Sequence, residues 1–333
     1  MRNDEALVRA LIEVGTWLQD IGYSFITVTP ATHQRVLARS DRPAQFVTDV
    51  FGWSRPFMRA LLPAHIVAVM ESAGLVENTD GLLRSKIRFS SLGGLLYVHS
   101  AYPTHAADAV FFGPDTYRFA ALVTRTVKQH AGAAIGNVID IGCGAGAGGI
   151  TALQAIDRGE TVQLTMADIN PTALLYARVN ARLAKVANAS TALSNLFENV
   201  SSPADLIIAN PPYLVDAARR AYRHGGGELG YELSVRIVRE ALPRLAPGGI
   251  LILYTGAPIV GGVDKFREAI APVITDEQID VSYDEIDPDV FGEELENIAY
   301  RGVDRIAAVS LIARVRMSEN VQAVVTAPSA MLQ

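Results

Sequence analysis

The sequence DLIIANPPYL, residues 205 to 214, places groups that can bind a ligand directly after a run of apolar residues. Leu206 to Ile208 are consecutive aliphatic residues, which is typical of a buried strand. Proline cannot donate to a sheet ladder and restricts the residue before it, so the two prolines predict that the strand stops at Asn210 and turns sharply. The strand therefore ends by presenting an amide and, at Tyr213, an aromatic ring.

These groups suit the binding of a flat NH2 group. The side-chain oxygen of Asn210 and the main-chain oxygen of Pro211 can each accept one of its hydrogens, which fixes the nitrogen and adds electron density to it. The ring of Tyr213 can stack on a planar group. An ordinary turn is the alternative interpretation, because Asn-Pro pairs commonly start turns.

A second set of candidate residues surrounds the glycine-rich stretch VIDIGCGAGAGG. Glycine adopts backbone angles that side chains forbid and lets a ligand approach the main chain, so Gly142, Gly144 and Gly146 predict a binding loop between a strand and a helix. The same pattern fits a dinucleotide-binding loop. However, Asp140 would repel a pyrophosphate and attract the ammonium group of a methionine moiety. Asp168 lies about twenty residues after the loop, where a carboxylate can accept both hydroxyls of a ribose.

The motifs DIGCGAG, ADINPTAL and NPPY, followed by HGGGELGYELSVRIV and LAPGGILIL, resemble the class I methyltransferases that use S-adenosylmethionine. The sequence is most similar to the release-factor glutamine methyltransferases, over roughly residues 111–316. The resemblance implies S-adenosyl-L-methionine as cofactor and methyl transfer to a planar nitrogen, with catalytic roles for Asn210, Pro211 and Tyr213. It implies that the cofactor is bound by Asp140, Gly142, Gly144, Gly146, Asp168, Ile169, Asn195, Leu196 and Asn210. Asn195 stands where the family often has Asp beside the adenine, and an amide can still bond the adenine amino group.

Two further stretches are candidates for substrate binding. RRAYRHGGGELGYE, after the NPPY turn, could form a mobile lid, and a solvated connecting loop is the alternative. FFGPDTYRFA matches the family's segment before the first strand, where Asp115 and Thr116 are candidates for contact with cofactor or substrate; a helix start capped by Asp115 is the alternative. The expected substrate-binding residues are Tyr117, Tyr213, Arg223, His224, Glu228 and Glu232.

The composition of the chain argues against several functional classes, although a local basic patch that binds nucleic acid remains compatible with it. A net charge of −6 and a pI near 5.6 provide no overall basic field for gripping nucleic acid. The single cysteine, Cys143, rules out an internal disulfide framework and a cysteine-based zinc cage, and it fits a reducing compartment. The six histidines show no metal spacing, so we expect no metal. Charged residues interrupt the first apolar segment, and no apolar run approaches the ~20 residues of a membrane span, so we expect a cytoplasmic protein without membrane contact.

The pattern of apolar residues predicts an α/β fold. From residue 111 strands alternate with helices, which predicts the Rossmann-like doubly wound sheet of a class I methyltransferase. The last two strands, QIDVSYDEI and DRIAAVSLIARVR, lack a clear helix between them and predict an antiparallel edge. The expected domains are a helical, winged-helix-like N-terminal domain at residues 1–105, the methyltransferase domain at residues 106–317, and a poorly ordered tail at residues 318–333.

Within the N-terminal domain, the sequence predicts helices followed by a hairpin. We expect one helix to end at Gly22, one to be capped by Ser54, and one to run from Pro63 to Gly74. Two strands are expected around a Gly93-Gly94 turn. Such a unit is compatible with a substrate lid, a dimerisation surface in a homodimer, or DNA binding.

The sequence alone does not identify the methyl acceptor. A protein glutamine side chain is what the resemblance implies. A free small molecule, such as an amino acid, a guanidino compound or a natural-product precursor, would suit Glu228 and Glu232. A nucleobase in RNA or DNA would use the same Asn-Pro turn but is less favoured by the acidic composition. A winged-helix regulator that retains the cofactor fold is the non-enzymatic alternative.

Overall fold

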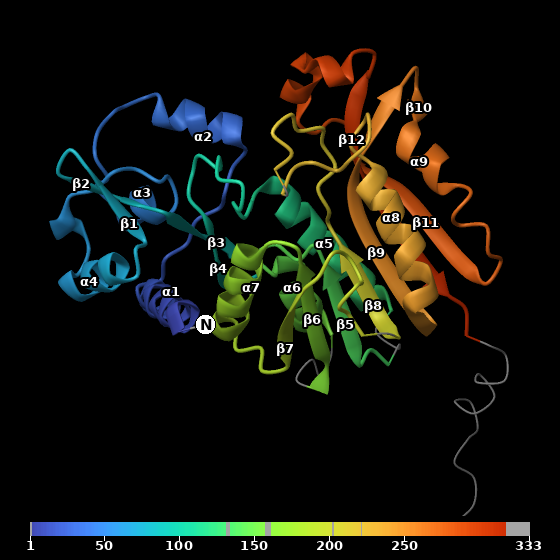
Figure 1. The fold of residues 1–333 in the computed structure, drawn as a ribbon, viewed down its shortest axis with the longest axis horizontal. Coiled ribbons are helices and arrows are strands. Elements are labelled where there is room, and N and C mark those ends of the chain that lie inside the picture. Colours follow the sequence, from blue (N-terminus) through green and yellow to red (C-terminus); the bar gives the residue numbers. More distant parts are fainter. Residues whose placement is uncertain (1, 131–133, 157–160, 202, 221, 318–333) are drawn as a thin grey trace, which may run out of the picture.

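The computed structural model describes residues 2–130, 134–156, 161–201, 203–220 and 222–317. Its N-terminal region is helical and carries two hairpins (Figure 1). The helices are α1 (Arg2–Asp20), α2 (Pro30–Leu37), α3 (Val47–Phe51), η1 (Arg59–Leu61) and α4 (Ala64–Ser72). The hairpins are antiparallel pairs of β1 (Val76–Thr79) with β2 (Leu82–Ser85) and of β3 (Ile87–Leu92) with β4 (Leu95–Ser100).

The rest of the described chain forms one mixed sheet with helices on both faces. The strand order is β11-β12-β9-β8-β5-β6-β7, and β5 to β9 run parallel in this sheet. β12 is antiparallel to β9, and β11 is antiparallel to β12, as the sequence predicts. The strands are β5 (Asn137–Ile141), β6 (Gln163–Asp168), β7 (Ala189–Leu193), β8 (Ala204–Ala209), β9 (Leu245–Val260), β10 (Val263–Asp264), β11 (Ile279–Asp287) and β12 (Arg305–Val315).

Alternate residues of the strands build a separate hydrophobic core on each face, because successive side chains in a strand point to opposite sides. Ile208 on β8 belongs to the core that includes α5, α6, α7 and the N-terminal region, whereas Ile207 belongs to the core covered by α8 and α9. The covering helices are α5 (Pro114–Gln129), α6 (Ala147–Ala155), α7 (Pro171–Leu183), α8 (Glu232–Ala241) and α9 (Lys265–Ile270), and the short 3-10 helices are η3 (Leu242–Arg244), η4 (Gly292–Glu296) and η5 (Ile298–Tyr300).

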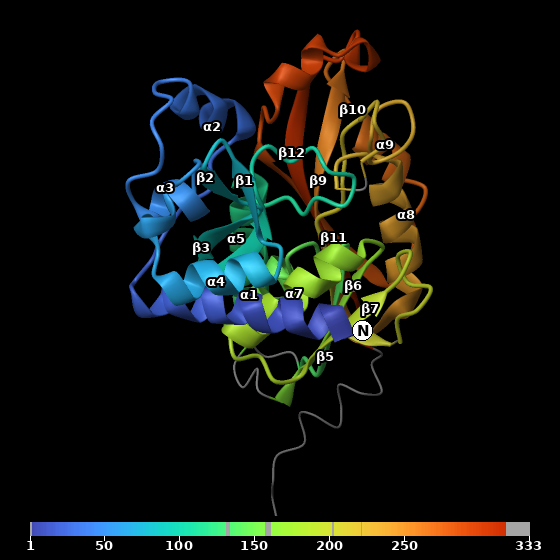
Figure 2. The ribbon, with the colours of Figure 1, turned by 60° about the vertical axis from the view of Figure 1, so that its left-hand side comes forward.

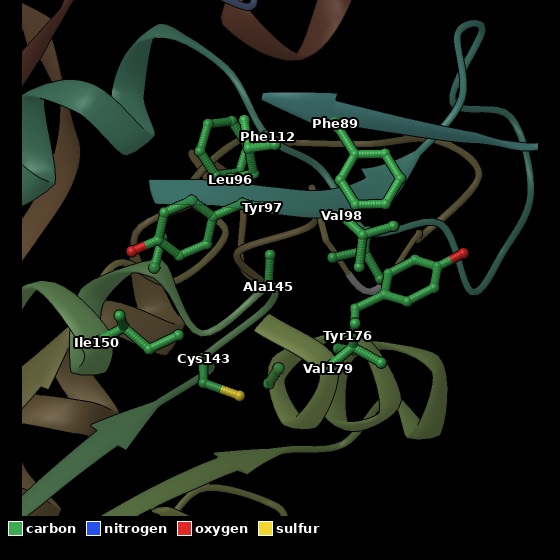
Figure 3. Packing of buried hydrophobic residues seen from close by; sticks show 14 of the residues in the cluster. Phe89, Leu96, Tyr97, Val98, Phe112, Cys143, Ala145, Ile150, Tyr176 and Val179 are labelled. Carbon is green, nitrogen blue, oxygen red and sulfur yellow. The ribbon is translucent and has the colours of Figure 1, made fainter. Parts of the chain in front are cut away.

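The N-terminal region packs directly on α7 and shares a continuous core with the sheet (Figure 2). Side chains of the β3–β4 hairpin, including Phe89 and Val98, meet Tyr176 and Val179 of α7 in this core (Figure 3). Asn180, which is fully buried on α7, pairs with both the amide and the carbonyl of Val98 at 2.8 and 3.1 Å. The N-terminal hairpin is therefore anchored against the sheet by both apolar packing and paired amide bonds.

Most predicted N-terminal elements are confirmed, and one is wrong. The helix before Gly22, the helix that starts after Pro63 and the strands around Gly93 are present. No helix begins at Ser54 in the described chain: α3 ends before it, and Ser54 adopts a positive φ of 55° and accepts a hydrogen bond from the Tyr102 amide. The winged-helix description and the domain boundaries stay predictions, and the predicted tail at residues 318–333 lies outside the described residues. None of the helices described is long and apolar enough to cross a membrane.

Candidate active site

The glycine-rich loop joins β5 to α6 and faces an open cavity. Gly142 and Gly144 have φ of 66° and 52°, and a Cβ built on either would meet no atom within 4 Å. Both residues line the cavity, so their backbone is open to a ligand. Gly146 has a different role: a Cβ there would lie 2.8 Å from the Met166 sulfur, and Gly146 is not among the lining residues. It allows the start of α6 to pack against β6.

Asp140 is buried beneath this loop, with 1% of its surface exposed, and it lines the cavity. Its Oδ2 accepts a hydrogen bond from the Gly149 amide at 2.8 Å. Burial raises the pKa of Asp140 to about 7. In the described structure no cation pairs with this carboxyl group, so a cationic ligand group in the cavity would be held here.

The pKa of Asp140 predicts a pH-dependent stability of the ligand-free protein. Because its pKa is raised on folding, the folded state binds more protons than the unfolded state between pH 3.8 and about 7. Stability from this group is therefore fully present at low pH and decreases as pH rises through that window. We expect Asp140→Asn to unfold at higher denaturant concentration than the wild type at pH 8 and to show a smaller change between pH 5 and pH 8. Urea titrations at both pH values test this, and equal pH dependence in the two proteins would contradict it.

Asp168 and its neighbours form the second side of the cavity. Asp168 ends β6, and its two oxygens accept hydrogen bonds from the amides of Gly144 and Asn170, each at 2.9 Å. These bonds hold the carboxylate at the tip of the strand. Ile169, with 55% of its surface exposed, lies beside it in the cavity wall. Asn195 and Leu196 complete this side, and the Asn195 amide donates to Glu198 at 2.9 Å.

The NPPY turn lines the same cavity. Asn210, Pro211, Pro212 and Tyr213 all line it, and Asn210 is partly exposed. Among the described residues, none makes a hydrogen bond with the Asn210 side chain, so its amide is available to a ligand. The parallel pairing of β5 with β8 brings this turn beside the glycine loop, as expected for carboxyl ends of adjacent parallel strands.

A buried carboxylate fixes the position of Tyr213. The Tyr213 hydroxyl donates to Asp115, which also accepts from the Tyr254 hydroxyl at 2.8 Å and from Arg118 at 3.1 Å. Arg118 in turn donates to Asp287 at 2.7 Å. Asp115 does not cap α5, whose N-cap is Gly113. Burial raises the pKa of Asp115, and the hydrogen bonds from both tyrosines oppose this effect. Tyr213 is thus 6% exposed and held at the cavity wall by its hydroxyl.

Aromatic residues that sequence reasoning missed line the acceptor side of the cavity. Phe111 and Tyr222 have nearly parallel rings, with centroids 6.3 Å apart and planes at 9°. The Tyr222 hydroxyl donates to the Thr104 carbonyl at 2.7 Å, which holds its ring. Phe291 also lines the cavity and packs against Tyr213. Phe111 and Tyr222 stand in stretches that the sequence singled out, whereas no sequence signal marks Phe291.

The predicted substrate-binding residues do not all lie at the same cavity. Arg223 lines the cavity and forms ion pairs with Glu294 and Asp216. His224 and Glu232 instead line a second hollow against α8, and Glu228 is exposed and lines neither of these two cavities.

Tyr117 is not among the residues that line the cavity. Its hydroxyl accepts from the Thr27 amide at 3.0 Å, and its ring packs edge-on against Phe112. The structure therefore brings Tyr213 and Arg223 to the cavity and leaves the other four predicted substrate residues outside it.

Residues 118–257 match the sequence model of the methyltransferase small domain family. They span the glycine loop, both aspartates and the NPPY turn. The chain contains a methyltransferase small domain. Domains of this family occur in methyltransferases that depend on S-adenosylmethionine. The arrangement of Asp140, the glycine loop and Asp168 fits that cofactor.

The matched relatives include enzymes with different acceptors. The release factor glutamine methyltransferase of Deinococcus radiodurans is 36% identical over 126 residues, which cover 35% of this chain and 44% of the relative. The ribosomal RNA small subunit methyltransferase C of Pasteurella multocida is 36% identical over 164 residues, which cover 49% of this chain and 43% of the relative. This chain thus matches less than half the length of these two relatives. The solved tRNA m1G37 methyltransferase of M. jannaschii superposes with a TM-score of 0.47 at 17% identity, covering 70% of this chain and 58% of that one.

Proposed function

We propose that the chain is an S-adenosylmethionine-dependent methyltransferase that acts on a planar amino or amide nitrogen. The observation that carries the proposal is a single cavity with a donor side and an acceptor side. Asp140, Gly142 and Asp168, which suit the cofactor, and Asn210 and Pro211, which suit the acceptor, all line this cavity. When bound, the cofactor supplies a methyl group activated by a sulfonium centre.

The residues of this chain would act by positioning. Asp140 would pair with the ammonium group of the methionine moiety, and Asp168 would accept hydrogen bonds from the ribose hydroxyls. The oxygens of Asn210 and Pro211 would each accept one hydrogen bond from the NH2 group of the substrate. These two bonds would direct the substrate nitrogen toward the methyl group. The acceptor nitrogen would form its bond to the methyl group as the bond from carbon to sulfur breaks, the electron pair of that bond would stay on sulfur, and the nitrogen would lose one proton to water. Neither a metal ion nor a covalent intermediate is required by this scheme.

A protein glutamine side chain is the first substrate candidate. The Deinococcus relative is named for that reaction, and the NH2 group of a primary amide can donate one hydrogen bond to the Asn210 side-chain oxygen and one to the Pro211 main-chain oxygen. A nucleobase amino group is the second candidate, because the parallel rings of Phe111 and Tyr222 offer flat surfaces beside the NPPY turn. The Pasteurella relative is named as a ribosomal RNA methyltransferase.

Methyl transfer from radiolabelled S-adenosylmethionine tests the function and the substrate class together. A cell extract separated into protein, RNA, DNA and small-molecule fractions is incubated with the protein, and label is counted in each fraction. Label in protein supports glutamine, label in nucleic acid supports a nucleobase, and label in the small-molecule fraction contradicts both candidates. Calorimetry with S-adenosylmethionine and NAD is the companion measurement, and binding of NAD alone would overturn the assignment.

The two substrate candidates make different demands on Tyr222. Stacking of a base on an aromatic ring contributes about 1–3 kcal/mol, so Tyr222→Ala should lower kcat/KM for a nucleobase acceptor by roughly 5- to 150-fold. The affinity for S-adenosylmethionine should stay within about twofold. Tyr222→Phe keeps the ring and loses the hydrogen bonds that the hydroxyl makes with the Thr104 carbonyl and with Arg220, so it should retain most activity. Steady-state kinetics with the acceptor found above measures the effect, and equal losses in both variants would show that the hydroxyl, not ring stacking, is what matters.

A further inference from the structure

The N-terminal region contains a buried positive charge without a counter-charge. Arg88 on β3 is 3% exposed and stands opposite His99 of β4 in the hairpin register. Its Nε donates to the Ser100 carbonyl at 3.1 Å. Within the described residues, neither of its Nη atoms makes a hydrogen bond, and no carboxylate forms an ion pair with it. Burial lowers the pKa of Arg88 to about 10, so the side chain remains charged at neutral pH.

No carboxylate is among the ionisable groups that affect the pKa of Arg88. They are the phenols of Tyr23, Tyr117 and Tyr102, and the hydroxyls of Tyr23 and Tyr117 already bond to Phe89 and Thr27. Both ring nitrogens of the nearby His99 make hydrogen bonds, Nε2 with the Ser90 hydroxyl at 2.7 Å and Nδ1 with the Ser100 carbonyl at 3.1 Å. A buried guanidinium without an ion-pair partner destabilises the folded state, and an anion that pairs with it would offset this cost.

A second buried polar atom in the same region also lacks a partner. His33 of α2 is 1% exposed, and its Nε2 is 2.9 Å from the Trp53 carbonyl, which makes Nε2 the donor. Its Nδ1 is buried without a hydrogen bond. Burial and the charge of Arg88 lower the pKa of His33 to about 4, so the ring is neutral and Nδ1 is a free acceptor. In the described structure, α2 thus leaves the buried Nδ1 of His33 without a partner, and β3 leaves the two Nη atoms of Arg88 without a hydrogen bond.

The region has an approach from solvent. The His33 ring stacks on the half-buried ring of Tyr102, with centroids 4.0 Å apart. Tyr102 belongs to segment 101–108, which is largely exposed. The Thr104 carbonyl of this segment accepts the hydrogen bond of Tyr222, which lines the methyl-transfer cavity, whereas neither Arg88 nor His33 lines that cavity.

We propose that Arg88 binds an oxyanion group, a phosphate or a carboxylate, between α2 and the β3–β4 hairpin, at a site separate from the methyl-transfer cavity. The planar guanidinium offers its two free Nη groups to two oxygens of the anion. An oxyanion that carries one proton can also donate to the free nitrogen of His33. The proposal does not depend on methyl transfer.

Thermal unfolding of the full chain tests the site. Inorganic phosphate, acetate and chloride are titrated at equal ionic strength. A saturable rise of about 2 °C or more in the unfolding midpoint with phosphate, acetate or both, but not with chloride, is expected. A response to phosphate alone assigns a phosphate group, and a response to acetate alone assigns a carboxylate. A response to neither would overturn the proposal.

Two variants test whether the rise in the unfolding midpoint depends on Arg88. Arg88→Met should abolish it, and Arg125→Met, which removes an exposed charge from α5, should leave it unchanged. An undiminished response in Arg88→Met would overturn the proposal. If Arg88→Met does not fold, a crystal structure of the wild type in the responding anion decides, and lack of anion density within hydrogen-bond distance of the Arg88 Nη atoms would equally overturn it.

Discussion

Asn210→Ala should lower kcat for methyl transfer by at least about 100-fold while leaving the affinity for S-adenosylmethionine nearly unchanged. The substitution removes one of the two oxygens proposed to hold the acceptor nitrogen, and preorganised polar groups of this kind typically contribute 100- to 1000-fold in rate. The Pro211 carbonyl alone would leave the acceptor free to rotate. Because the Asn210 side chain makes no hydrogen bond within the described protein, its removal should not disturb the fold. Single-turnover transfer of labelled methyl measures the rate, and calorimetry measures the cofactor affinity.

Asn199→Ala is a suitable control for this experiment. Asn199 is also an amide after a strand end, but its side chain donates to the Leu193 carbonyl at 2.8 Å and it does not line the cavity. This variant should keep wild-type activity. Full activity in Asn210→Ala would contradict the proposed positioning of the acceptor, whereas equal losses in both variants would point to a general effect on folding.

The residues of the sheet and the donor side could be predicted because their signals are local. A strand followed by glycines with positive φ, and an acid at the end of the next strand, leave clear patterns in the sequence. Thus β5, Gly142, Gly144 and Asp168 all lie where the sequence placed them. Parallel topology then brings the NPPY turn beside them without further information.

The acceptor side could not be predicted in the same way because distant segments assemble it. Phe291 reaches the cavity from the segment between β11 and β12, and Tyr222 is held by Thr104 from the N-terminal side. Asp115 and Thr116 line the cavity, so their predicted place at the site agrees with the structure, but the sequence does not show that the Asp115 carboxylate is bonded by Tyr213 and Tyr254 from two other parts of the chain. Among the described residues of the predicted lid, Tyr222 and Arg223 line the cavity, whereas His224, Glu228 and Glu232 do not. Sequence spacing alone does not show which face of such a loop turns inward.

The N-terminal misprediction has a similar origin. Ser54 and Pro56 are a typical helix start, yet Ser54 instead accepts a hydrogen bond from the Tyr102 amide. The Ser54 hydroxyl thus bonds a residue 48 positions away in the sequence and does not cap a helix that starts beside it. This tertiary contact also holds the segment whose Tyr102 ring stacks on His33.

Asp168→Ala should weaken the binding of S-adenosylmethionine by roughly 100-fold or more. Hydrogen bonds to a charged group contribute about 1.5–3 kcal/mol each, and two ribose hydroxyls would lose their acceptor together. The glycine loop would also lose the bond between the Gly144 amide and Asp168 at 2.9 Å, which holds the loop beside the ribose position. Calorimetry of the cofactor with wild type and variant measures the change directly.

Asp205→Ala separates the loss of a cofactor contact from the loss of a structural bond. The Asp205 carboxylate also accepts hydrogen bonds from two backbone amides, those of Gly136 and Asn137 at 2.8 and 2.9 Å, but it does so at the opposite end of the sheet. Both variants should therefore lose comparable stability in urea unfolding. Only Asp168→Ala should lose cofactor affinity, because only Asp168 lines the cavity. An unchanged Kd for S-adenosylmethionine in Asp168→Ala would contradict the proposed contact between Asp168 and the ribose. It would also contradict the proposed cofactor position, which directs the methyl group toward Asn210.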